Sequence, residues 1–276
     1  MTGPLIERDL AVTLLQPLTA LVARAGAAVL AVCRHPMQVV GKADGSPVTQ
    51  ADHIADAILA EGLAELLPGV FVLSEEHISH TMPGHPRTFV LIDPLDGTRE
   101  FIDGRDEYTV NLALVTDNTP LLGIVGAPAL GLIWRGVVGH GAERLTVDAD
   151  GALGAASAIH TRPRPPGPWV AAVSRSHGDQ RTEAFIDSRP GAARRQMGSA
   201  VKFGRVAEGA ADIYPRLAPT SEWDVAAGHA VVTAAGGLVT DSRGRPVRFG
   251  DAPGDVIIPE FIAWGDPAGA IANPGS

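Results

Sequence analysis

Six consecutive residues combine two carboxylates, a glycine and a hydroxyl at the end of an apolar run. The segment Asp93-Pro94-Leu95-Asp96-Gly97-Thr98 directly follows the aliphatic and aromatic residues 89–92. Such a run, ending in Pro and Gly, predicts a buried strand that stops at a turn. Two carboxylates on this turn can share hard cations, and free N–H groups after Thr98 can receive a phosphate oxygen. The alternative is a tight turn made of good turn-forming residues.

Three further acidic residues stand where they can add ligands to the same site. Glu75 follows the apolar run 70–74, so it is expected at the exit of a second strand, although a solvated loop acid is the alternative. Asp224 begins an alanine-rich helical pattern, and Asp52 begins another, three residues after Thr49. Taken singly, Asp224 is better explained as a complement to the helix dipole and Asp52 as part of a capping box.

In this order, with Thr98, these residues resemble the inositol monophosphatase-like superfamily of lithium-sensitive phosphatases. The resemblance extends over roughly residues 10 to 265 and is carried by several blocks, namely 46–52, 93–102, 107–114, 173–177 and 219–230. Within the superfamily, the blocks are most similar to the branch that hydrolyses 3′(2′),5′-bisphosphate nucleotides. The resemblance implies hydrolysis of adenosine 3′,5′-bisphosphate to AMP and phosphate, which clears a by-product of sulfur assimilation.

The resemblance also implies Mg²⁺, held as two or three ions. Its ligands would be Glu75, Asp93 and the carbonyl of Leu95 for one ion, and Asp93, Asp96 and Asp224 for a second. A third, weaker ion would lie near Glu75 and Asp52. Oxygen ligands favour Mg²⁺ over softer metals, and paired cations can polarise a phosphoryl group and lower the pKa of a bound water. By the same resemblance, Asp52 and Thr98 form a dyad that orients and deprotonates the attacking water.

Two blocks of the second half offer groups for a second phosphate and a ribose. Ser174-Arg175-Ser176-His177 ends a predicted strand, and Gly198-Ser199-Ala200-Val201-Lys202 opens a predicted helix. Hydroxyls, cations and helical N–H groups suit these ligands. The substrate-binding residues predicted from the resemblance and from these blocks are Glu75, Asp96, Gly97, Thr98, Ser174, Arg175, His177, Ser199, Lys202 and Asp224. The alternative for the second-half blocks is a surface loop followed by an ordinary helix start.

Two residues depart from the pattern of the superfamily. Arg99 stands where relatives commonly have Lys, so the charge is kept but its geometry toward a phosphate differs. His77 replaces a usual acid beside the predicted third ion, which makes operation with three metals less secure than with two. His77, His80 and His85 fit no zinc-binding spacing, and a polar loop accounts for them.

Composition is consistent with a soluble enzyme and decides little by itself. The formal net charge of −9 and the pI of about 5.4 argue against a nucleic-acid polymer as partner. The single cysteine, Cys33, excludes an intrachain disulfide and is expected to fill an apolar helix. Charges and Pro17 interrupt the apolar N-terminal stretch, which predicts an amphipathic helix and a cytoplasmic protein. Peripheral association with the inner face of a membrane, and the oligomeric state, stay open.

The expected fold is a mixed α+β and α/β sandwich of alternating helix and sheet layers, with the active site between two subdomains. These would be an N-terminal metal-binding α+β subdomain, 1–155, and a C-terminal α/β subdomain, 156–276, joined by an Ala-, Gly- and Pro-rich linker at 151–168. The expected helices are about 7–33, 50–66, 199–209 and 223–235 with one starting near 178, and the expected strands include 88–92, 108–116, 121–127, 169–174, 212–214 and 238–240.

Two other functions remain possible from the sequence. The metal-binding turn is shared with inositol-phosphate and sugar-phosphate monoesterases, so the substrate depends on the second half of the chain. A phosphometabolite-binding protein with the same fold is the non-enzyme alternative. It is weakened because a binding protein would not need to keep both Asp52 and Thr98.

Overall fold

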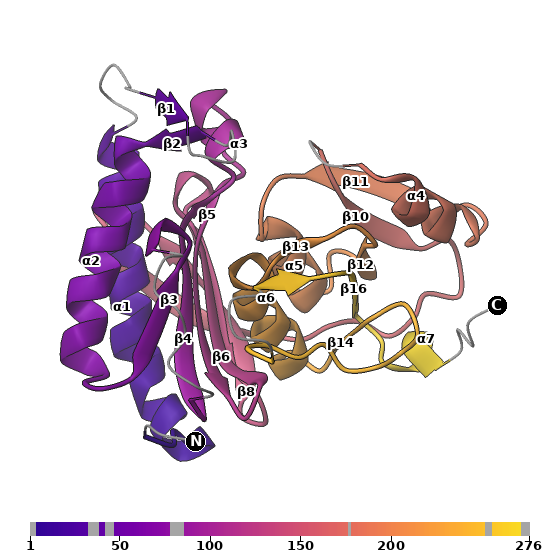
Figure 1. Cartoon of the computed structure of the whole chain (residues 1–276). Coiled ribbons are helices and arrows are strands. Elements are labelled where there is room, and N and C mark those ends of the chain that lie inside the picture. Colours follow the sequence, from indigo (N-terminus) through magenta and orange to yellow (C-terminus); the bar gives the residue numbers. More distant parts are fainter. Residues whose placement is uncertain are drawn as a thin grey trace.

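The computed structural model shows alternating layers of helix and sheet (Figure 1). It describes residues 4–32, 39–41, 47–77, 86–175, 178–251 and 256–271. Two long helices form one outer layer against a seven-stranded sheet, and two further helices separate this sheet from a five-stranded one. Three groups of buried apolar residues fill the spaces between successive layers. This is the layered arrangement that the sequence predicted.

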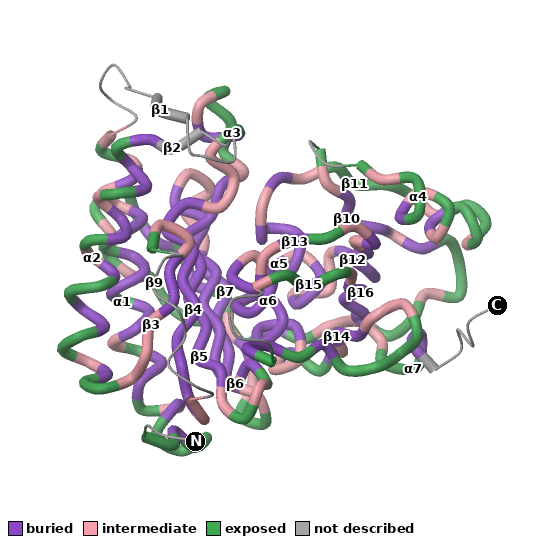
Figure 2. The backbone as a smooth tube through the Cα atoms, in the orientation of Figure 1, coloured by how far each residue is buried: buried purple, intermediate pink, exposed green. Residues whose placement is uncertain are grey.

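The seven-stranded sheet is the framework of the N-terminal half. Its strands are β3 (Phe71–Ser74), β4 (Thr88–Asp96), β5 (Thr109–Thr116), β6 (Thr119–Ala127), β7 (Leu132–Val137), β8 (Gly141–Val147) and β9 (Leu153–Ile159), in that spatial order. β3 and β4 are parallel, and every other pair is antiparallel. Helices cover both faces, so β4 and β5 are buried almost throughout (Figure 2). This explains why their sequences are continuous apolar runs rather than alternating patterns.

Helices α1 (Arg8–Val32) and α2 (Gln50–Leu66) cover one face of this sheet, and α6 (Glu222–Ala234) covers the other. Small residues on both elements let α6 pack closely against the seven-stranded sheet. A Cβ atom on Gly123 would come within 2.1 Å of the Ala227 carbonyl oxygen, and one on Gly136 within 2.7 Å of the Ala234 Cβ. The alanine-rich composition of α6 therefore reflects packing, and this packing fixes where its first turn meets the end of β4.

The C-terminal half contains the five-stranded sheet. Its strands are β11 (Ala193–Met197), β10 (Val170–Ser174), β12 (Ile213–Arg216), β16 (Phe261–Trp264) and β14 (Leu238–Thr240), in that order. Helix α5 (Val201–Ala207) packs with α6 between the sheets. Helices α4 (Gln180–Asp187) and α7 (Ala268–Ile271) contribute to the outer core. The short elements are α3 (Thr98–Ile102), the 3₁₀ turns η1 (Glu75–His77) and η2 (Pro128–Leu130), and the strands β1 (Val39–Gly41), β2 (Pro47–Thr49), β13 (Thr220–Ser221) and β15 (Ile257–Ile258).

The prediction of a linker over 151–168 was wrong in its first part. Residues 153–159 form β9, which pairs with β8 and crosses the predicted boundary at 155/156. Most side chains of this edge strand are exposed, so it has no alternating apolar pattern and its composition resembles a linker. β11, which pairs parallel to β10, was likewise not among the expected strands. The division into two subdomains stays a prediction, and Cys33 lies outside the described residues.

Helix α1 is long and apolar enough to cross a membrane by length and composition, the one such helix in the part of the chain that the structure describes. Half of its most apolar window is buried inside the molecule. Leu18, Leu21 and Val22 belong to the core between the helices and the seven-stranded sheet. Packing in this core accounts for the apolar character of α1.

Histidine 229 in α6 should make the fold sensitive to acid. Its side chain is 6% exposed, lies edge-on to the Phe249 ring, and has no hydrogen-bond partner for Nδ1 among the described residues. Burial lowers its pKa to about 4 from 6.5. The unfolded chain binds this proton near pH 6.5, and the folded chain binds it only near pH 4. Above pH 6.5 the protonation of His229 therefore costs the fold no stability, and below it the free energy of unfolding falls as the pH drops toward 4. The expected loss from this group by pH 5 is about 2 kcal/mol.

Urea unfolding of the wild type and of His229→Leu at pH 7.5 and pH 5 measures this effect. All other titrating groups are common to both proteins, so the difference between their pH dependences isolates His229. Equal losses of unfolding free energy in the two proteins would contradict the assignment.

Candidate active site

The end of β4 presents the predicted metal-binding turn. Between Asp93 and Asp96 the register of β4 against β5 shifts, so the strand bulges where the carboxylates emerge. The Leu95 N–H donates to Asp93 Oδ1 at 3.1 Å, which fixes that carboxylate within the bulge. Gly97 has a φ of 90° and caps α3, a conformation that a side chain would strain. The local sequence thus forms a turn that directs both carboxylates away from the strand.

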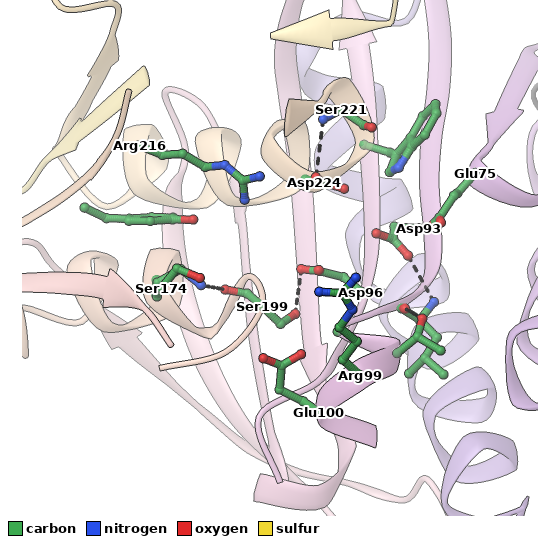
Figure 3. Close-up of a pocket in the computed structure, with 16 residues that line it drawn as sticks. Glu75, Asp93, Asp96, Arg99, Glu100, Ser174, Ser199, Arg216, Ser221 and Asp224 are labelled. Carbon is green, nitrogen blue, oxygen red and sulfur yellow. Dashed lines mark hydrogen bonds between the residues drawn. The ribbon is translucent and has the colours of Figure 1, made fainter. Parts of the chain in front are cut away.

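The four acidic side chains predicted as ligands line one pocket at this turn and come from three elements (Figure 3). Carboxylate oxygens of Asp93, Asp96 and Asp224 lie within 4.8 Å of one another. Asp224 comes from the first turn of α6, and Glu75 comes from η1 after β3. The structure therefore brings together the side chains that the sequence predicted as ligands, from both halves of the chain.

Burial and neighbouring negative charges oppose the ionisation of Asp93 and Asp224. Burial raises the pKa of Asp93 well above its usual value, and the charges of Glu75, Asp96 and Asp224 raise it further. Burial, followed by the charge of Asp96, raises the pKa of Asp224 to about 7, although the Thr220 hydroxyl donates to it. A divalent cation would relieve this repulsion, and an all-oxygen donor set suits a hard cation. The residues therefore fit a metal centre.

Asp52 forms the predicted capping box with one carboxylate oxygen and contacts Thr98 with the other. Its Oδ2 accepts from the Thr49 N–H at 2.8 Å and from the Thr49 hydroxyl at 2.7 Å, which closes a capping box at the start of α2. Its Oδ1 lies 3.3 Å from the Thr98 hydroxyl, which also contacts the Leu95 carbonyl at 3.2 Å. Asp52 is 1% exposed. The cap therefore holds a carboxylate rigidly against Thr98.

Residues at the start of α5 reach the same pocket from the second half. The Ser199 hydroxyl donates to Asp96 Oδ2 at 2.5 Å, and Lys202 Nζ donates to the Ser199 carbonyl at 2.6 Å. Lys202 is 2% exposed, and its ammonium lies 5.0 Å from the centre of the Tyr214 ring. Burial lowers the pKa of Lys202 to about 8. With Ser174, these side chains line the same pocket as the acidic cluster.

Arg175 and His177 differ from the other predicted substrate residues, all of which line the pocket. Arg175 does not line the pocket, because its guanidinium pairs with Glu107 at 2.6 Å and contacts the Gln196 carbonyl. Glu107 also accepts from the Gly198 N–H at 3.1 Å. The Arg175–Glu107 ion pair is therefore also bonded to the loop before α5. His177 lies outside the described residues. The substrate role of both therefore stays a prediction without support from a described contact.

Arg216 and Tyr214, which line the pocket from β12, were not predicted from the sequence. Arg216 Nη2 donates to the Pro219 carbonyl at 3.2 Å, while its buried Nε has no hydrogen-bond partner in the described structure. Figure 3 shows its guanidinium directed toward Asp224. A tyrosine and an arginine two positions apart at a strand end share one face, and this spacing was the available signal. Glu100, Ser221 and Trp223 also line the pocket.

Comparisons with known proteins match most of the chain. A sequence model described as the inositol monophosphatase family matches residues 11–269. The chain is 41% identical to the 3′(2′),5′-bisphosphate nucleotidase CysQ of Escherichia coli K12, over 78% of this chain and 84% of that protein. It is 33% identical to CysQ of Haemophilus influenzae, with 82% of each chain covered. The crystal structure of CysQ from Bacteroides thetaiotaomicron matches with a TM-score of 0.75 and 32% identity, over 90% of this chain and 96% of that one.

These matches confirm the predicted fold class and the predicted resemblance. A Thermotoga maritima inositol monophosphatase, with a TM-score of 0.74 over 95% of this chain and all of its own, is 22% identical and supports the fold alone. The chain therefore belongs to the inositol monophosphatase family.

Proposed function

We propose that this protein is a cytoplasmic, Mg²⁺-dependent 3′(2′),5′-bisphosphate nucleotidase that hydrolyses adenosine 3′,5′-bisphosphate to AMP and phosphate. The observation that carries the proposal is a single pocket lined by both acidic and cationic side chains. Its acidic side is the cluster of Glu75, Asp93, Asp96 and Asp224, its cationic side is Lys202 with Arg216, and Arg99 lines the same pocket. A substrate with two phosphates can place one on each side. The names of the relatives that share most of the chain support the same substrate.

The acidic side would hold two Mg²⁺ ions through Glu75, Asp93, the Leu95 carbonyl, Asp96 and Asp224. The ions would supply polarisation of the phosphoryl group and a water of lowered pKa. Asp52 accepts a hydrogen bond from Thr98 and is protected from solvent, so it can take the proton of an attacking water through that hydroxyl. Ser199 joins the two sides, because its hydroxyl holds Asp96 while its carbonyl holds Lys202.

Lys202 should discriminate between substrates with one and two phosphates. Lys202→Met keeps most of the buried side-chain volume but removes the charge. We expect the KM for adenosine 3′,5′-bisphosphate to rise by at least about tenfold, because a hydrogen bond to a charged group is lost. The KM for a simple phosphate monoester should change little.

In the wild type, the KM for the bisphosphate should also rise as the pH passes the Lys202 pKa of about 8. Steady-state kinetics at pH 7 and pH 9 measure both effects, and equal KM changes for the two substrates would remove Lys202 from second-phosphate recognition.

The function is tested by phosphate release from the purified protein with Mg²⁺. Adenosine 3′,5′-bisphosphate, inositol 1-phosphate and fructose 1,6-bisphosphate are compared at matched concentrations, with and without Li⁺. A strong preference for the nucleotide, inhibited by Li⁺, is the expected result. Preference for inositol phosphate or sugar phosphate would replace the substrate while keeping the metal chemistry. Absence of release from all three would favour a phosphometabolite-binding protein.

A further inference from the structure

A buried carboxylate that the proposed mechanism does not use lies behind the Glu75 turn. Asp56 belongs to α2, one helical turn after Asp52, and is 4% exposed. Its Oδ1 accepts from the Ser74 hydroxyl at 2.5 Å, and its Oδ2 lies 3.1 Å from His77 Nδ1. Burying a carboxylate is costly unless it is paired and hydrogen-bonded, and both partners of Asp56 come from one four-residue segment.

The two partners of Asp56 flank the predicted ligand Glu75 on both sides. Ser74 is the last residue of β3, and its hydroxyl also accepts from the Glu76 N–H at 3.2 Å. His77 is the last residue of η1. One carboxylate on a long, well-packed helix therefore fixes the beginning and the end of the turn that carries Glu75.

We propose that Asp56 is a positioning residue for the metal centre, acting on Glu75 through Ser74 and His77. The inference rests on the proposed function, because it requires Glu75 to hold an ion. Residues that orient metal ligands from behind commonly change metal affinity tenfold or more when they are removed. Helix α2 then supports two parts of the site from one face, since Asp52 contacts Thr98 and Asp56 fixes the Glu75 turn.

This arrangement gives His77 a role. His77 contacts Asp56 and stands where the superfamily pattern has an acid. The unusual residue at this position, His77, therefore helps to orient Glu75 through Asp56. It does not need to be a metal ligand itself.

The test is Mg²⁺ binding to folded protein without substrate, measured by calorimetry and by the Mg²⁺-induced rise in Tm. Asp56→Ala should weaken Mg²⁺ binding about tenfold. Asp56→Asn should weaken it less, because an amide oxygen can still accept from Ser74. Ser74→Ala and His77→Gln each remove one contact and should give smaller losses. Combining Ser74→Ala or His77→Gln with Asp56→Ala should cause little further loss of Mg²⁺ affinity. Each single change already breaks a contact between Asp56 and the Glu75 turn.

Asp212→Asn is the matched control. Asp212 is 2% exposed and is held by Arg162 at 2.6 and 2.8 Å and by the Val170 N–H at 2.6 Å, but it does not line the pocket. Its substitution should lower Tm without changing Mg²⁺ affinity. Wild-type Mg²⁺ affinity in folded Asp56→Ala would overturn the proposal. If that variant does not fold, wild-type affinity in both Ser74→Ala and His77→Gln would do the same. Failure of the wild type to bind Mg²⁺ would instead refute the metal-dependent function itself.

Discussion

Asp93→Asn should abolish Mg²⁺-induced stabilisation and lower phosphate release by at least about a thousandfold, because Asp93 is the proposed ligand of both ions. The same change should stabilise the metal-free protein at pH 8. Burial and three neighbouring acids raise the Asp93 pKa in the folded state, so ionisation of Asp93 opposes folding once the pH exceeds its value in the unfolded chain. An isosteric amide removes that penalty. Thermal unfolding with and without Mg²⁺ and single-turnover assays measure the three effects.

Asp117→Asn is the control for this experiment. Asp117 pairs with Arg87 on the surface, at the other end of the β4–β5 pair, and its φ of 49° is one that asparagine tolerates. The control should keep its Mg²⁺ response and its activity, because an exposed ion pair contributes little. A Mg²⁺-induced Tm rise in Asp93→Asn equal to that of the wild type would contradict the proposed centre.

Asp52→Asn should lower kcat by about 10²- to 10⁴-fold while leaving the binding of adenosine 3′,5′-bisphosphate nearly unchanged. The amide still has an oxygen to accept from Thr49, so the start of α2 can form, but it cannot accept a proton from Thr98. Steady-state kinetics give kcat, and calorimetry with the slow variant gives the substrate affinity.

Thr49→Ala separates the two roles of Asp52. It removes the hydroxyl that completes the capping box but leaves the contact between Asp52 and Thr98. We expect a stability loss of about 1 kcal/mol and a small change in kcat. Near-normal turnover of Asp52→Asn, or an equally large loss of kcat in Thr49→Ala, would remove the Asp52–Thr98 dyad from the mechanism.

Features that depend on neighbouring residues were predictable from the sequence. A turn at Asp93–Thr98 and the capped start of α2 at Thr49 follow from the conformational preferences of residues a few positions apart. The prediction that the strand ends at Ile92 was wrong, because β4 continues through a bulge to Asp96. α1 and α6 were predicted within one residue at each end, because their apolar and small residues extend over many helical turns. The assembly of ligands from three segments was predicted only through the resemblance, since spacing along the chain does not place distant segments together.

Tertiary structure decided which polar groups meet. Arg175 was predicted to face the substrate but pairs with Glu107, which the preceding half of the chain supplies. Arg216 enters the pocket because β12 lies between β10 and β16, and a sequence pattern does not specify that strand order. In the sequence, Asp56 has the pattern of an ordinary helix-surface residue. Only the packing of α2 brings it into contact with Ser74 and His77. By itself, the sequence determined the local turns, the helices and, through resemblance, the chemistry. Long-range packing decided the ion pairs and the cationic side of the pocket, because those contacts join residues that local conformational preference cannot bring together.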